Sequence, residues 1–145
     1  MIWSRQIAII AALLGCFGLL DSGYLTIKHL QGAYIRCDDE CSAVLGSRYA
    51  EGIAGVPLAG FGAMAYVTVI VTAIFAAVGS IRAKRILALL VSAMALFSMW
   101  LIYLQAFVIH AFCKYCLASA ATSFALAGLA LIDRLITARR ASPTA

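Results

Sequence analysis

The chain has 145 residues, of which 65% are hydrophobic and 12% charged, and it carries a formal net charge of +5. A soluble domain is excluded, because its surface would need more polar residues than this composition supplies. Nucleic-acid binding is disfavoured, because the basic residues bracket apolar segments and form no stripe interleaved with stacking aromatics. We therefore expect one integral membrane domain over residues 1–145, in contact with the lipid bilayer.

Four segments reach the roughly 20 mainly apolar residues that a spanning helix needs. They are predicted, in chain order, at about 7–27, 58–79, 86–109 and 113–132. The outer loop, about 28–57, is broken up by glycines and a proline. Within it, residues 42–49 favour a short helix at the membrane interface. The predicted fold class is therefore all-α: an integral membrane bundle of four transmembrane helices whose outer loop carries a short interfacial helix.

The first predicted helix contains Cys16 and Asp21. An ionisable residue inside a spanning helix is costly and often functional, so Asp21 could accept protons or anchor the outer loop. The alternative, of equal weight, is a structural carboxylate near the interface. Cys16 is expected to be a buried apolar side chain. A lipoprotein signal ending at Cys16 is disfavoured, because the apolar stretch continues through Leu25, whereas signal segments end at the cleavage site.

Four of the five cysteines form two close pairs, Cys37/Cys41 in the outer loop and Cys113/Cys116 at the start of the fourth predicted helix. The spacing of three places both sulfurs of the later pair on one helix face. A helix N-terminus stabilises thiolates and makes cysteines reactive. We expect Cys113 to lie nearer water and Cys116 one turn deeper, within reach of an aromatic acceptor dissolved in the membrane.

A flexible outer pair and a helix-anchored inner pair are the parts that a disulfide relay needs, since exchange proceeds through mixed disulfides. Two alternatives stay open on spacing alone. The four thiolates could bind zinc, or the two pairs could be static disulfides. Catalytic exchange is the interpretation that we favour, without a metal.

The basic residues divide unevenly between the two ends of the predicted bundle. Seven of eleven lie at the end with both termini and the tight turn that the 82–85 stretch is expected to fill: Arg5, Arg82, Lys84, Arg85, Arg134, Arg139 and Arg140. Lys and Arg near helix ends favour the cytoplasmic side. We predict a multi-pass membrane protein with both termini in the cytoplasm, so that both cysteine pairs face the opposite, oxidising side.

Several further motifs accompany the cysteines. The Ser-Arg-Tyr-Ala of 47–50, the Gly-Val-Pro of 55–57 and the Gly-Phe-Gly of 60–62 follow the outer pair, and Asp-Ser-Gly-Tyr-Leu-Thr at 21–26 ends the first helix. With the later CxxC, they resemble the vitamin K epoxide reductase (VKOR) family, in particular its small bacterial members without a fused thioredoxin domain. The four-helix thiol oxidases of the DsbB type match less well, because they carry CxxC in the first outer loop.

The resemblance implies a role for each cysteine. Cys37 corresponds to the residue that exchanges with a partner protein, and Cys41 to the one that attacks Cys113. Cys116 is then left as a thiolate against a quinone of menaquinone or ubiquinone type. Ser47 matches a family hydroxyl that orients a cysteine or binds the ligand; its alternative role is a turn or helix cap.

The implied activity is that of an oxidoreductase supporting disulfide bond formation. The implied partner is a separate periplasmic thioredoxin-fold, DsbA-like protein, and the implied location is the bacterial cytoplasmic membrane. Animal members that reduce vitamin K epoxide carry an Asn and a Tyr where this chain has Leu58 and Ala120. Those two residues and Phe61 are expected to hold the quinone by apolar contact. The alternatives are reduction of vitamin K quinone or epoxide, or a non-catalytic metal-binding or scaffold membrane protein.

Overall fold

The computed structural model describes residues 2–31 and 39–141, without the side chains of 2–4, 40 and 41. The helical elements are α1 (Ile2–Leu30), α2 (Asp39–Leu45), α3 (Leu58–Ala77), α4 (Ile81–Tyr103), the π-helix η1 (Leu104–Ile109) and α5 (Lys114–Ala141). In the described part, four helical spans are long and apolar enough to cross a membrane, and η1 continues the third of them. The predicted fold class, an all-α membrane bundle of four helices, is confirmed.

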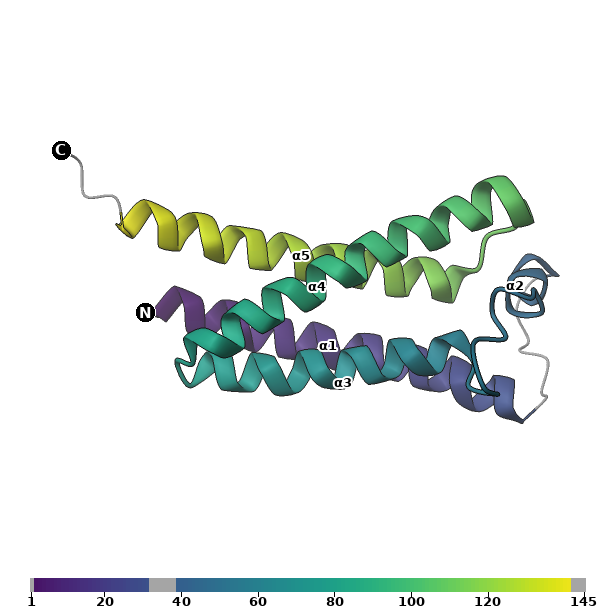
Figure 1. Cartoon of the computed structure of the whole chain (residues 1–145), viewed down its shortest axis with the longest axis horizontal. Helices are drawn as coiled ribbons and strands as arrows, with labels where there is room; N and C mark the ends of the chain where they lie inside the picture. The colour runs from purple at the N-terminus through teal and green to yellow at the C-terminus, as the bar shows by residue number, and fades with distance from the viewer. Residues whose placement is uncertain (1, 32–38, 142–145) are drawn as a thin grey trace.

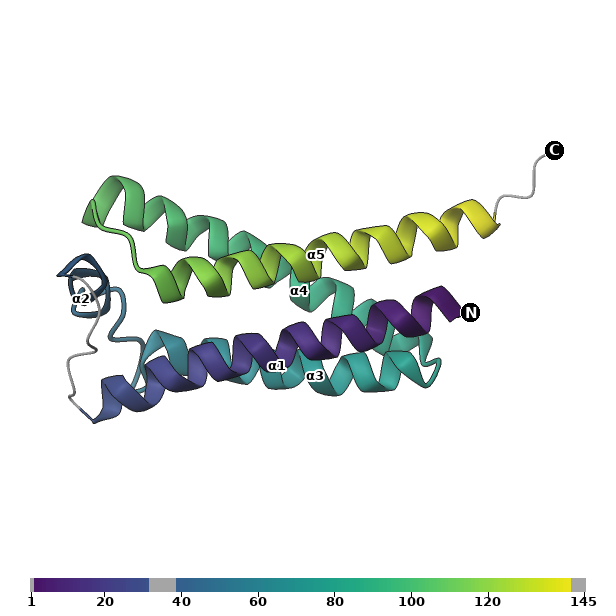
Figure 2. The same ribbon diagram turned by 180° about the vertical axis from the view of Figure 1, so that it is seen from behind.

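The bundle consists of two helix pairs that diverge at one end (Figures 1 and 2). α1 and α3 run side by side and form the most extensive contact, whereas α4 crosses from α3 to lie against α5. α1 begins and α5 ends where α3 turns into α4, and we call this the terminal end. α2 lies at the opposite end, where α4 connects to α5, and we call this the cysteine end.

Small residues allow α1 and α3 to approach closely, as is common between membrane helices. A Cβ atom on Gly18 would lie 2.6 Å from Cδ1 of Tyr66, and one on Gly15 would lie 2.9 Å from Cγ1 of Ile70. Tyr66 is fully buried against Gly18, and its hydroxyl donates to the carbonyl oxygen of Ser119 at 2.8 Å. One tyrosine therefore ties α3 to α5 through the centre of the bundle.

Towards the terminal end the helices pack through alanines and branched aliphatic residues. The buried core there comprises Ala8, Ala11, Val69, Ala73, Ala76, Ala83, Val91 and Leu126. These side chains have no polar atoms, so this core is held by apolar packing and not by hydrogen bonds between its side chains. Cys16 does not join this core: its side chain is exposed, and the expectation of burial was wrong. The small residues Gly15 and Gly18 turn the other face of α1 towards α3, which leaves Cys16 facing the lipid side.

α1 and α5 extend beyond the predicted 7–27 and 113–132, over Ile2–Leu30 and Lys114–Ala141. Two further boundaries differ from those expected for local reasons. α4 begins at Ile81 rather than near 86, because Gly79 turns the chain at φ +103° and the Ser80 hydroxyl accepts the N–H of Ala83 at 3.3 Å. The basic residues of 82–85 therefore lie in the first turns of α4 and do not fill the turn. The outer helix α2 covers Asp39–Leu45 rather than 42–49. Beyond its end, Ser47 Oγ donates to the carbonyl of Val44 at 2.7 Å and satisfies an acceptor of the last helical turn.

Candidate active site

The inner cysteines lie at the start of α5, where the helix meets α2. The carbonyl of Cys113 accepts the N–H of Leu117 at 3.0 Å, so Cys113 precedes the first helical residue. Its side chain is completely buried in a cluster with Val44 and Ala111, against which Cys116 packs. The expectation that Cys113 lies nearer water is therefore wrong, since α2 covers it. Cys116 is the more accessible of the two.

A π-helix and a left-handed residue shape the approach to this pair. The backbone carbonyl of Gln105 accepts N–H groups from His110 and, at 3.2 Å, from Ala111. His110 has φ +54°, which ends the helix and turns the chain towards α5. The side-chain Oε1 of Gln105 accepts the N–H of Cys113 at 3.0 Å. Because that N–H precedes a helix, it has no intrahelical acceptor, and Gln105 satisfies it.

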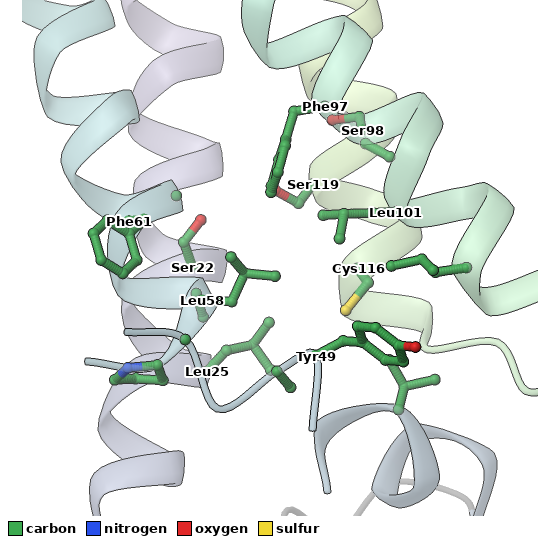
Figure 3. A pocket seen from close by; sticks show the side chains of 18 of the residues that line it. Ser22, Leu25, Tyr49, Leu58, Phe61, Phe97, Ser98, Leu101, Cys116 and Ser119 are labelled. Carbon is green, nitrogen blue, oxygen red and sulfur yellow. The ribbon is translucent and has the colours of Figure 1, made fainter. Parts of the chain in front are cut away.

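The two helix pairs enclose a pocket of about 630 Å³ at the cysteine end. α1, α3, α4 and α5 all contribute to its wall, and the segment that follows α2 lines it as well. Figure 3 shows Cys116 projecting from α5 into the pocket, with Leu58 and Phe61 on the opposite side and Tyr49 below. A mostly apolar pocket of this volume fits a small aromatic ligand. One reactive sulfur therefore borders a ligand-sized apolar space.

All four residues predicted to bind or orient a quinone line this pocket: Ser47, Leu58, Phe61 and Ala120. Leu58 and Phe61 lie in the first turn of α3, and Ala120 lies about one turn beyond Cys116 on α5. The hydroxyl of Ser47 is directed to the carbonyl of Val44, which corresponds to the capping role held open for it. Ser47 can bond to the end of α2 and still contact a ligand in the pocket, because a hydroxyl that donates one hydrogen bond can also accept one.

The lining also contains polar residues that the sequence did not single out. Gln105 and Ser98 are buried residues of the α4–η1 segment, and Ser119 and Ser123 surround the hydroxyl of Tyr66 from α5. A polar residue inside an apolar spanning segment is itself a signal, because its burial in a membrane is costly. That signal marks Gln105 most clearly, since its side chain is the longer of the two buried polar residues of the third span, Ser98 and Gln105.

Asp21 lies outside the pocket lining, on α1. Its Oδ2 atom is fully covered and has no hydrogen-bond partner within residues 2–31 and 39–141. The carboxyl group is close enough to Cys113 for the two to interact electrostatically. A proton-accepting role and a structural role both stay predictions for this residue.

The outer pair is described only in part. Cys37 lies outside the described residues, and Cys41 lies within α2 although its side chain is not described. Val44, three residues later on α2, packs against Cys113. The backbone at Cys41 is therefore about one helical turn from a residue that contacts the inner pair.

No three His, Cys, Asp or Glu side chains are grouped so as to hold a metal ion in the part of the chain that the structure describes. The zinc alternative requires the side chains of Cys37 and Cys41, which lie outside that part. It therefore stays an alternative to the relay.

A four-helix bundle with a cysteine pair bordering an apolar pocket defines a class: a multi-pass membrane protein equipped for thiol redox chemistry. The model of the Vitamin K epoxide reductase family matches residues 9–131, from α1 almost to the end of α5. The chain therefore belongs to the VKOR family. Membership makes it a membrane thiol oxidoreductase related to quinone and vitamin K redox chemistry.

Proposed function

We propose that the protein oxidises a separate thioredoxin-fold, DsbA-like protein and passes the electrons to a membrane quinone of menaquinone or ubiquinone type. The observation that carries this proposal is the position of Cys116, which borders the 630 Å³ pocket while its neighbour Cys113 is covered by α2. One sulfur of the pair meets the ligand space, and the other meets the element that carries Cys41. This division matches a relay from a protein donor to a lipid-soluble acceptor.

The proposed relay consists of two disulfide exchanges and one quinone reduction. Two partner thiols reduce a Cys37–Cys41 disulfide and leave as a partner disulfide. Cys41, as a thiolate, attacks Cys113 in a Cys113–Cys116 disulfide and releases the Cys116 thiolate. Cys37 then displaces Cys113 and restores the outer disulfide. Reoxidation of the inner pair delivers two electrons and two protons to the quinone, and the product is hydroquinone.

The chain contributes several features to this chemistry. The N-terminus of α5 stabilises negative charge on Cys116, which lies in its first turn. α2 covers Cys113 through Val44, which favours exchange with the cysteine that α2 itself carries. Leu58, Phe61 and Ala120 supply apolar contact for a quinone ring. The absence of the animal Asn and Tyr at the positions of Leu58 and Ala120 favours a quinone over an epoxide substrate.

The proposed setting is the bacterial cytoplasmic membrane, with the cysteine end facing the periplasm. The charge asymmetry supports this orientation, because Arg82, Lys84 and Arg85 begin α4 while Arg139 and Arg140 end α5 at the terminal end. An oxidising compartment at the cysteine end is what disulfide formation requires.

The test is steady-state quinone reduction driven by a reduced thioredoxin-fold donor, with wild type and Cys116→Ala in the same membrane preparation. We expect turnover in wild type and none above background in the variant, because the sulfur at the pocket is removed. Cys16→Ala is the matched control, since Cys16 is an exposed cysteine of α1 outside the pocket lining. Retained turnover in Cys116→Ala would refute the proposal.

A further inference from the structure

We propose that Gln105 is the hydrogen-bond donor that binds the quinone oxygen beside Cys116, an assignment that rests on the proposed function and deepens it. The animal enzymes' donor positions are occupied here by Leu58 and Ala120, neither of which has a polar side chain. Without a donor in the pocket wall, a quinone would be held by apolar contact alone, and its oxygens would be neither bound nor oriented. A donor from elsewhere in the wall would supply that hydrogen bond.

The two ends of the Gln105 amide have different environments. Oε1 accepts the N–H of Cys113 at 3.0 Å, and since an N–H can bond only to an acceptor, this contact fixes which end of the amide is oxygen. The NH₂ group therefore points elsewhere, with two hydrogens to donate. Within the described residues no hydrogen bond is made by Nε2.

Gln105 lies in the pocket wall, which gives its NH₂ group access to a bound ligand. Gln105 is only 3% exposed and lines the cavity together with Cys116. In the described part of the chain, Oδ2 of Asp21 is the polar side-chain atom that is both fully covered and without a hydrogen-bond partner. Nε2 of Gln105 also makes no hydrogen bond there, so it must retain some accessible surface. A buried side chain with an unpartnered donor that retains access to a cavity is suited to a ligand acceptor.

The backbone fixes this donor next to the redox pair. At the π-helix, the backbone carbonyl of Gln105 accepts the N–H groups of His110 and Ala111. Its side-chain oxygen accepts the N–H of Cys113. Short π-helical segments are frequent at functional sites. A quinone ring that contacts Cys116 would therefore have one oxygen towards the Gln105 amide. As the ring takes up electrons, that oxygen becomes more basic, and a preoriented N–H donor stabilises it.

The decisive experiment pairs a variant with a ligand that lacks the oxygens. Binding of 2,3-dimethyl-1,4-naphthoquinone and of 2,3-dimethylnaphthalene is measured by equilibrium dialysis with the oxidised full chain in nanodiscs. In Gln105→Leu we expect quinone binding to weaken roughly ten-fold, the usual effect of one lost hydrogen bond to a ligand, and hydrocarbon binding to stay within about two-fold of wild type. Equal weakening for both ligands would assign Gln105 a structural role only and overturn the proposal.

A second variant separates the two functions of the amide. Gln105→Glu, assayed at a pH high enough to ionise the carboxyl group, keeps an oxygen that can accept the N–H of Cys113 and has no hydrogen to donate. It should also weaken quinone binding and lower the maximal rate of quinone reduction. Ser92→Ala, an exposed hydroxyl on α4 outside the pocket, is the control and should match wild type. Wild-type quinone affinity in Gln105→Glu would overturn the proposal, whereas failure of wild type to bind any quinone would overturn the proposed function itself.

Discussion

The terminal and cysteine ends of the bundle are built from the same four helices but packed in different ways. Near the terminal end, alanines, valines and leucines fill the space, as in the cluster of Ala8, Ala76 and Ala83. Near the cysteine end the helix pairs diverge around a pocket, and buried polar residues such as Gln105 and Ser98 appear in its wall. The contrast teaches that one half supplies rigidity and the other supplies a site.

Tyr66 marks the border between the two halves. Its ring packs on Gly18 in the α1–α3 interface, while its hydroxyl contacts Ser119 and Ser123 of α5. The core on one side of it includes Val69 and Ala73, and the pocket begins on the other side. Because Tyr66 joins α1, α3 and α5 at this level, the helix pairs can separate beyond it without loss of the bundle.

The largest effect should come from breaking the cysteine end at its outer pair. Cys37→Ala should abolish oxidation of a thioredoxin-fold donor, because exchange with a protein partner needs this sulfur, while a small dithiol such as dithiothreitol should still be oxidised through Cys113 and Cys116. Quinone reduction is measured with both donors on one preparation. Equal loss with both would refute this division between the pairs.

A smaller effect should follow from filling the pocket. Leu58→Trp should raise the KM for quinone by roughly 10–100-fold. The larger ring would take up space that the bound quinone needs, and overpacking of this kind costs about 1–3 kcal/mol. Leu89→Trp, on an exposed position of α4, is the matched control and should leave the KM unchanged. An unchanged KM in Leu58→Trp would separate the pocket from quinone binding.

The smallest effect on catalysis should come from the terminal end. Ala73→Leu places a larger side chain where Ala73 is fully buried, so it should lower the free energy of unfolding by about 1–3 kcal/mol. Thermal unfolding in detergent would measure the loss, and quinone KM should not change. A raised KM for quinone with an unchanged free energy of unfolding would show that packing at the terminal end controls quinone binding, against this account.

Hydropathy and residue spacing predicted the spanning helices and the class of chemistry well. Long apolar runs are sufficient to identify spanning segments, and CxxC at a helix start is visible as a pattern. The burial of Cys113 was not predictable, because it depends on α2 folding back over the start of α5. Gln105 is visible in the sequence as a polar residue in an apolar span, but its contact with Cys113 was not predictable, since it requires a π-helix and a left-handed His110 that no periodicity encodes.

The central claim is that the inner pair reduces a quinone held in the pocket, and a single-turnover reaction tests it most directly. Protein carrying Cys37→Ala and Cys41→Ala is reduced, freed of reductant and mixed with one equivalent of quinone in the absence of oxygen. We predict one hydroquinone per chain and, by mass spectrometry, one disulfide joining Cys113 to Cys116. Unreduced quinone beside a pair of free thiols would contradict the account.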